Sequence, residues 1–266
     1  MNGERLTTMA VRPELHVLND LSQWATAAAT LTLKLRRQAL EERGRFWLAL
    51  SGGRTPEQLY HRLATVSTGS EWTSTDFFFS DERCVPPDHS ESNFLLAEQA
   101  LFRPLSIPQP RIHRMRGEHP DPDAAAREYE DVLQTVTSAA RGGWPHLDLV
   151  LLGVGNDGHT ASLFPGTDVL HEPRRWVAVG HAPSDPPTRL TLTLGVINQA
   201  TVVLFLASGE SKAGIVKTIL EPQQESDRQL PAAQVRPERG RLIWVLDRAA
   251  AAKLTGHSAQ HYPRPT

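Results

Sequence analysis

The sequence has little of several features that would each point to a class of protein. It contains one cysteine, Cys84, so no disulfide can form within the chain. No apolar run approaches the roughly 18 residues that a membrane-spanning helix needs. The net charge of −2 lacks the basic excess that nucleic-acid and anionic-membrane surfaces require. The first residues lack the apolar core of a secretory signal, so we expect a cytoplasmic enzyme or binding protein with no nucleic-acid or membrane partner.

What is present is an ordinary globular composition, with 39% hydrophobic and 22% charged residues. Continuous apolar runs alternate with segments of helical periodicity, which is typical of a mainly parallel sheet with helices on both faces. No linker or internal repeat divides the chain, so we expect one α/β domain. The predicted strands are 46–50, 76–80, 111–115, 147–152, 176–180, 190–194, 201–207 and 242–246, and the predicted helices are 21–43, 56–63, 92–102, 122–139, 212–220 and 247–254.

The segment 147–166, LDLVLLGVGNDGHTASLFPG, is the most informative part of the chain. A buried strand that stops at a loop rich in glycine and polar residues presents side chains at the carboxyl edge of a sheet. Open α/β folds bind their ligands at that edge. Within the loop, Asp157 and His159 flank Gly158. Histidine changes its charge near neutral pH and a carboxylate can orient it, so this pair is a candidate acid–base group. The alternative is a histidine that only caps a turn.

The glycines of this loop also match the dinucleotide-binding pattern G-x-G-x-x-G at Gly153, Gly155 and Gly158. That pattern needs a helix directly after it and a carboxylate at the end of the next strand. Pro165 and Gly166 cut such a helix short, and the strand 176–180 ends without a carboxylate. We therefore disfavour nucleotide binding. We also disfavour a metal site here, because no H-x-x-x-H or C-x-x-C spacing surrounds His159.

A second candidate site follows the strand 46–50, in the loop SGGRT at 51–55. Glycines before a helix N-terminus expose backbone N–H groups beside the positive end of the helix dipole, which favours a phosphate. The hydroxyls of Ser51 and Thr55 and the guanidinium of Arg54 would add donors. We expect Thr55 to be the N-cap of the helix, with Pro56 and the capping-box residue Gln58 after it. The alternative is a plain turn between a strand and a helix.

Charged residues also follow the strand 76–80, where Asp81, Glu82 and Arg83 form either a solvated loop or a polar cluster at the sheet edge. Farther along the chain, Arg189 and Lys212 lie beside predicted strands. Each could reach an anionic substrate, although a solvated surface charge is the alternative for either residue alone.

Taken together, these segments resemble the 6-phosphogluconolactonase family. The resemblance is carried in the family's order by LALSGGRTP, FFFSDERCVPPDHSESN, LDLVLLGVGNDGHTASLFPG, RLTLTL, VVLFLASGESKA and LPAAQVRP. It implies a three-layer α/β/α fold like that of glucosamine-6-phosphate deaminases, without a metal or organic cofactor. It also implies hydrolysis of 6-phospho-D-glucono-1,5-lactone to 6-phosphogluconate, the second step of the oxidative pentose phosphate pathway. It spans residues 15–254, so we expect an N-terminal extension at 1–14 and a flexible tail at 255–266.

The resemblance also implies roles for particular residues. His159 falls on the catalytic histidine, with Asp157 beside it, and it would activate the water that attacks the lactone carbonyl. Asp81 and Arg83 fall in the substrate pocket, and Arg189 and Lys212 match basic residues that approach the phosphate. The remaining predicted contacts form the phosphate-side loop, namely Ser51, Gly52, Gly53, Arg54 and Thr55. Asn156 falls on a variable position.

Two rival functions stay open. The related deaminases resemble the chain in the same loops, but they have a glutamate five residues after the histidine, where this chain has Phe164. They also read D-E-Y where this chain has S-D-E-R, and both departures favour the lactonase. A sugar-phosphate sensor would bind ligand without turnover. We expect a phosphorylated sugar lactone as the ligand, and the protein to be a monomer rather than an obligate oligomer.

Overall fold

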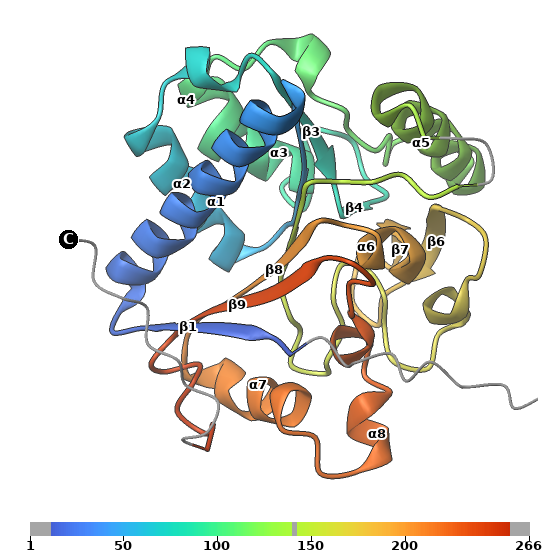
Figure 1. Cartoon of the computed structure of the whole chain (residues 1–266). Helices are drawn as coiled ribbons and strands as arrows, with labels where there is room; N and C mark the ends of the chain where they lie inside the picture. The colour runs from blue at the N-terminus through green and yellow to red at the C-terminus, as the bar shows by residue number, and fades with distance from the viewer. Residues whose placement is uncertain (1–11, 140–142, 256–266) are drawn as a thin grey trace, which may run out of the picture.

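The computed structural model describes residues 12–139 and 143–255. Its centre is a six-stranded sheet, parallel throughout, in the order β1-β9-β8-β5-β2-β3 (Figure 1). The predicted mainly parallel sheet is therefore confirmed. Its strands are β1 (Glu14–Leu18), β2 (Phe46–Leu50), β3 (Thr75–Phe79), β5 (Leu149–Leu152), β8 (Val202–Ala207) and β9 (Arg241–Asp247).

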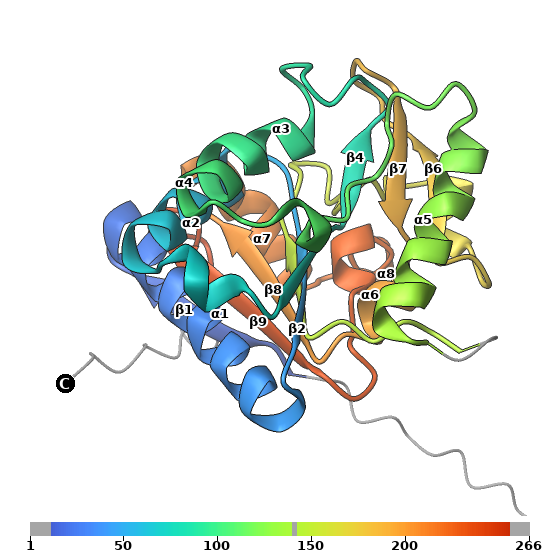
Figure 2. The ribbon, with the colours of Figure 1, turned by 90° about the horizontal axis from the view of Figure 1, so that it is seen from above.

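Helices cover both faces of this sheet, as Figure 2 shows from above. Alternate residues of one strand pack into opposite cores, so Leu48 and Leu50 of β2 face one layer while Trp47 and Ala49 face the other. The first layer contains α1 (Leu21–Arg43), α2 (Arg54–Val66), α3 (Asn93–Ala97) and α4 (Arg103–Leu105). The second contains α5 (Pro122–Thr137), α6 (Leu194–Asn198) and α7 (Ala213–Leu220), with the short α8 (Glu225–Arg228) after α7. The predicted three-layer α/β/α architecture is confirmed.

A smaller antiparallel sheet extends the second layer, in the order β4-β7-β6. Its strands are β4 (Asp81–Arg83), β6 (Val177–His181) and β7 (Thr188–Leu192). The sequence predicted two of these strands without assigning them to a separate sheet. The prediction of a strand over 190–194 is shifted, because Thr193 is already the N-cap of α6. The strand therefore ends at Leu192, and the hydroxyl of Thr193 donates to the carbonyl of Arg175.

Local signals located several elements accurately. α1 begins after Asp20, whose carboxylate accepts the N–H of Gln23 at 2.8 Å, and it ends at Gly44 in the left-handed conformation with φ of 70°. β2 has the predicted bounds. β1 was not predicted and begins at Glu14, the last residue assigned to the N-terminal extension. Residues 1–11 and 256–266 of the two predicted ends lie outside the described residues.

Two predicted elements are wrong. Residues 111–115 form no strand and pair with β3 at one bridge, between Ile112 and Phe77. One direct bond joins the segments there, from His113 N–H to the carbonyl of Phe77 at 2.8 Å. The next pairing is replaced by the hydroxyl of Tyr129, which accepts from Phe79 N–H and donates to the carbonyl of His113, both at 2.9 Å. Within the predicted helix 247–254, Asp247 ends β9 and the residues after it form turns. Their backbone bonds mix spacings of three and four residues.

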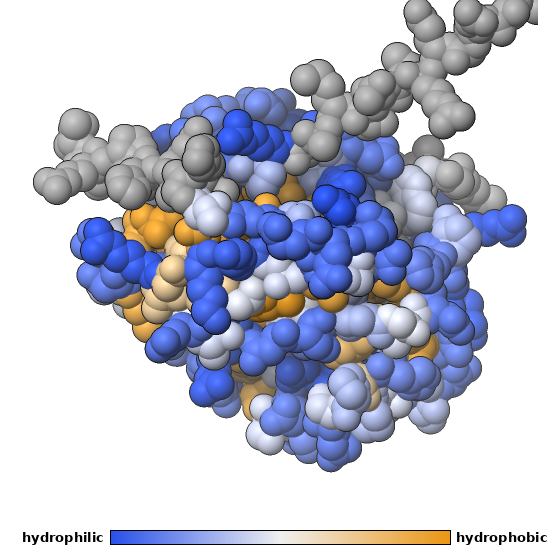
Figure 3. Space-filling view, turned by 90° about the horizontal axis from the view of Figure 1, so that it is seen from below, coloured by the Kyte–Doolittle hydropathy of each residue, from blue (hydrophilic) through white to orange (hydrophobic). Residues whose placement is uncertain are grey.

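No helix in the described ranges is both long enough and apolar enough to cross a membrane. The face seen from below in Figure 3 is mainly hydrophilic, with apolar side chains visible in hollows and at one edge.

Candidate active site

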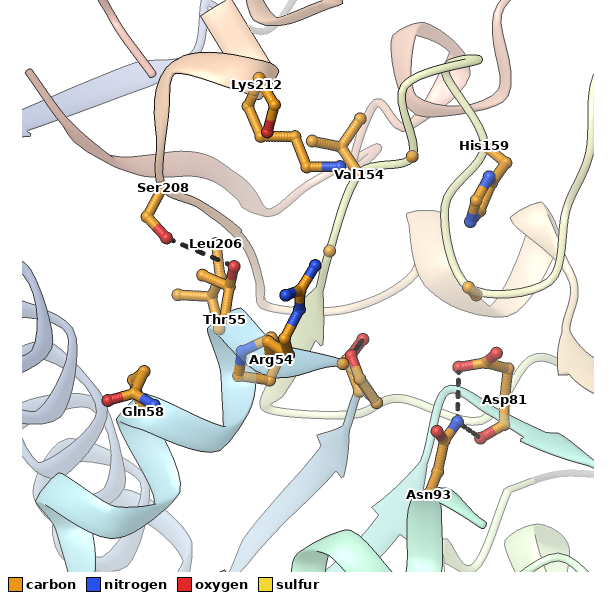
Figure 4. A pocket seen from close by; sticks show the side chains of 18 of the residues that line it. Arg54, Thr55, Gln58, Asp81, Asn93, Val154, His159, Leu206, Ser208 and Lys212 are labelled. Atoms are coloured by element: carbon orange, nitrogen blue, oxygen red, sulfur yellow. Dashed lines mark hydrogen bonds between the residues drawn. The ribbon is translucent and has the colours of Figure 1, made fainter. Parts of the chain in front are cut away.

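The carboxyl ends of four strands surround one cavity of about 550 Å³. Its walls come from the loops after β2, β5 and β8 and from β4, which follows β3 directly (Figure 4). The site thus lies where an open parallel sheet is expected to bind a ligand. Nine of the predicted residues line it, namely Ser51, Gly52, Gly53, Arg54, Thr55, Asp81, Arg83, His159 and Lys212.

The loop after β5 presents His159 to the cavity, backed by Asp157. Nδ1 of His159 lies 2.6 Å from Oδ1 of Asp157, and the same oxygen accepts the backbone N–H of His159 at 3.2 Å. The two side chains are 32% and 44% exposed, so water reaches both of them. A carboxylate at Nδ1 favours the tautomer with the proton on that nitrogen, which leaves the lone pair of Nε2 free to accept a proton. The ring of Phe164 packs 4.5 Å from the histidine ring.

The glycine pattern of this loop has a geometric reason other than a nucleotide. A Cβ on Gly155 would lie 2.1 Å from Nδ1 of His159 and 2.5 Å from Oδ1 of Asp157, so only glycine leaves room for the pair. Gly158 has φ of 85°, a conformation that favours glycine. Turns follow the loop instead of a helix, as Pro165 predicted.

The loop after β2 faces the cavity from the other side. Its last residue, Gly53, has φ of 102° and is the N-cap of α2, and no side chain caps that helix. The prediction that Thr55 is the N-cap is therefore wrong. Thr55 lies in the first turn, and its hydroxyl is 3.4 Å from that of Ser208. The uncapped helix start leaves backbone N–H groups for an anion. The buried hydroxyl of Tyr60 fixes the loop, since it accepts the N–H and donates to the carbonyl of Ser51.

Two cations stand beside this helix start. Arg54 is exposed, whereas Lys212 is half-buried at the end of the single turn η5 (Glu210–Lys212) that follows β8. Burial lowers the pKa of Lys212, Asp157 opposes that shift, and Arg54 adds to it. The ammonium donates to Oδ1 of Asn156 at 2.9 Å. Asn156, for which no role was predicted, therefore joins the cationic end of the cavity to the loop that carries His159.

The charged run after β3 is a polar cluster rather than a solvated loop. Asp81 is 7% exposed and Glu82 is 2% exposed. Glu82 accepts the N–H groups of Asn93 and Phe94 at 2.7 and 2.8 Å, so it anchors the start of α3, and burial raises its pKa. Arg83 is partly exposed, and its guanidinium hydrogen-bonds to the carbonyl of Glu91.

Arg189 is the predicted cation that does not line the cavity. It lies on β7 directly opposite Arg83 of β4 and is 5% exposed. Burial lowers its pKa, and the neighbouring Arg83 lowers it further. Its Nη1 is buried without a hydrogen-bond partner. The strand pairing thus places Arg189 beside Arg83, and its contact with a substrate phosphate stays a prediction.

The sequence analysis missed several cavity residues, among them Asn93 and Ser208. Ser208 follows β8 directly, so its position at a strand end was a usable signal. Asn93 is brought to the site by α3, which no short motif reveals. Among the described residues, no group of three or more His, Cys, Asp or Glu side chains could hold a metal ion.

The comparisons with known proteins agree with this geometry. The family model of glucosamine-6-phosphate isomerases/6-phosphogluconolactonase matches residues 19–244. The chain belongs to this family. A 6-phosphogluconolactonase of Nostoc sp. is 37% identical over 92% of this chain and 100% of its own length. The human 6-phosphogluconolactonase is 43% identical over 82% of this chain and 84% of its own.

Solved structures support the same assignment. The 6-phosphogluconolactonase from Trypanosoma cruzi superimposes with a TM-score of 0.83 at 29% identity, covering 94% of this chain and 99% of that one. The predicted resemblance to 6-phosphogluconolactonases is confirmed.

The close approach at Gly155 yields a prediction. Gly155→Ala should push the His159 ring away from Asp157, because the added methyl group overlaps both side chains. Histidine-ring ¹⁵N NMR, which reports the tautomer, should show His159 losing its preference for Nδ1–H. Gly153→Ala is the matched control, since the nearest atom to its Cβ, Oγ of Ser51, is 4.0 Å away. Equal spectra for the two variants would contradict the packing argument.

Proposed function

We propose that the protein hydrolyses 6-phospho-D-glucono-1,5-lactone to 6-phosphogluconate in the oxidative pentose phosphate pathway. The observation that carries the proposal is one cavity with two chemically different ends. His159 and Asp157 form a proton-accepting pair at one end, and Arg54, Lys212 and the start of α2 form a cationic end. Curated relatives at 37–43% identity that bear the name 6-phosphogluconolactonase support the same substrate.

The reaction is acyl transfer to water. Nε2 of His159 takes a proton from water as the oxygen attacks C1 of the lactone, and a tetrahedral intermediate forms. When the bond between C1 and the ring oxygen breaks, the imidazolium returns the proton to that oxygen, so proton and charge balance. Asp157 holds the ring at Nδ1 and stabilises its charged form. A positioned base of this kind contributes about 10²–10⁴-fold to the rate.

The phosphate positions the substrate far from the reacting carbon. Arg54, Lys212 and the N–H groups at the start of α2 are its proposed partners, and binding there orients C1 toward His159. Arg83 is the candidate to stabilise the oxyanion, because it is a cation that lines the cavity next to Asp81. Asp81 accepts hydrogen bonds from sugar hydroxyls. Arg189 adds positive potential beside Arg83.

The environment of His159 favours hydrolysis over deamination. Five residues after the histidine stands Phe164, whose apolar ring packs on the imidazole, so no second carboxylate occupies that position. A sensor without turnover would need neither the Asp157 contact nor the free Nε2. A cytoplasmic, monomeric, cofactor-free enzyme remains our prediction, and some curated relatives are named as chloroplastic.

The first test is catalysis itself. Wild-type protein should accelerate loss of the phospholactone above the spontaneous rate in an NMR or pH-stat assay, and it should leave glucosamine 6-phosphate unchanged. His159→Ala should lower kcat by about 10²–10⁴-fold with a small change in KM, because a base acts in the transition state. His61→Ala is the matched control, since His61 is an exposed histidine on α2. Normal turnover by the His159 variant would refute the assignment of the base.

The second test concerns Lys212. A lowered pKa means that Lys212 loses its charge at a lower pH than an ordinary lysine, so affinity for 6-phosphogluconate should fall as the pH rises toward and beyond that pKa. Calorimetric titration should show this fall for the wild type. Lys212→Arg, which stays charged, should abolish it, whereas Lys212→Met should weaken binding by about 10- to 100-fold at neutral pH. Lys217→Arg on α7 is the control, and a pH dependence that survives in Lys212→Arg would contradict the role of Lys212.

A further inference from the structure

Asp81 is a buried carboxylate whose hydrogen-bond partners are all neutral. It is 7% exposed, yet it lines the cavity. Among the described residues, no cation lies within ion-pair distance of it. Such a carboxylate is costly unless donors are directed at both of its oxygens. The neighbouring Ser80 hydroxyl donates to Oδ1 at 3.3 Å, and two other segments of the chain supply the remaining donors.

The first donor is Ser162, which lies in the same loop as His159. Ser162 is 1% exposed, and its hydroxyl donates to Oδ2 of Asp81 at 2.7 Å. Its own backbone N–H donates to the hydroxyl of Thr191 at 3.2 Å, which fixes it on β7. Preceding it, Ala161 has a positive φ of 47°, an unusual conformation for alanine that turns the chain toward Asp81. The hydrogen bond therefore joins the strand after β3 to the loop of the proposed base.

The second donor is Asn93 at the start of α3. Its Nδ2 donates to the backbone carbonyl of Asp81 at 2.9 Å and to Oδ1 at 3.3 Å (Figure 4). Its own position is fixed, because its backbone N–H bonds to Glu82 and its Oδ1 packs against Gly52. A Cβ at Gly52 would lie 1.8 Å from that oxygen. The side chain of Asn93 thus has little room to rotate.

We propose that Ser162 and Asn93 are positioning residues that fix the Asp81 carboxylate toward the sugar hydroxyls of the substrate. Ser162 sets the distance between this carboxylate and His159, because it contacts the first and shares a loop with the second. The proposal rests on the proposed lactonase function. Ser162 and Asn93 act on substrate recognition through Asp81 and take no part in the chemical step. Asp81 is held in place before the substrate arrives, so its orientation costs nothing on binding.

A double-mutant cycle tests the proposal. Ser162→Ala should lower kcat/KM for the phospholactone by about tenfold, which is the usual size of a lost hydrogen bond to a charged group. The loss should appear mainly in KM, because Asp81 contacts hydroxyls in the ground state as well as in the transition state. In an Asp81→Asn background, the same substitution should change kcat/KM less than twofold, because the group through which Ser162 acts is already gone.

Thr160→Val is the matched control. Thr160 is another buried hydroxyl of the same loop, 1% exposed, and it donates to the carbonyl of Gly153 at 2.8 Å without contacting Asp81. Its effect should be the same in the wild-type and Asp81→Asn backgrounds. Thermal melting of every variant separates loss of fold from loss of recognition. If Ser162→Ala does not fold, Asn93→Ala enters the same cycle and should show the same non-additivity.

The outcomes distinguish the two proposals. A wild-type protein that does not hydrolyse the lactone refutes the proposed function. An active wild type in which Ser162→Ala and Asp81→Asn act additively, or in which Asp81→Asn is as active as the wild type, refutes the positioning role alone. A Ser162→Ala variant that loses kcat while KM stays unchanged also refutes it, because that pattern places the effect on His159.

Discussion

The parallel register of β8, β5 and β2 decides where every functional side chain of this protein can lie. β5 pairs with β8 along Leu149–Leu152 and with β2 at Leu48 and Ala49, so the three strands end at the same edge of the sheet. The loops that follow them are therefore brought together although they are far apart in the sequence. A slip of one residue in β5 would exchange the side chains on its two faces. Because each face packs into its own hydrophobic core, such a slip would disrupt both cores.

The loops divide the work of the cavity between its two ends. The start of α2 and the side chains of Arg54 and Lys212 concentrate positive charge at one end, where a phosphate is favoured. His159 and Asp157 occupy the other end, and Gly155 leaves the space in which they meet. The bond from Lys212 to Asn156 connects the ends directly. The distance between phosphate and base is thus fixed by the fold, which is the condition for positional catalysis.

Local signals in the sequence predicted the parts of the structure that depend on neighbouring residues. The cap at Asp20, the bounds of β2 and the lack of a helix before Pro165 depend on sterics and hydrogen bonds within a few residues, and they were predicted correctly. Features that depend on distant partners were not predicted. Tyr129 replaces a strand pairing, and Asn93 and Ser162 reach Asp81 from other parts of the chain. No local pattern contains that information, because the partners lie many residues apart.

A crystal structure with bound 6-phosphogluconate would test the central claim most directly, because the two ends of the ligand are chemically distinct. We predict that the phosphate lies between Arg54, Lys212 and the start of α2, with the C1 carboxylate within hydrogen-bond distance of Nε2 of His159. A ligand bound in the opposite direction, with its phosphate at His159, would contradict it, and so would a ligand bound outside the cavity.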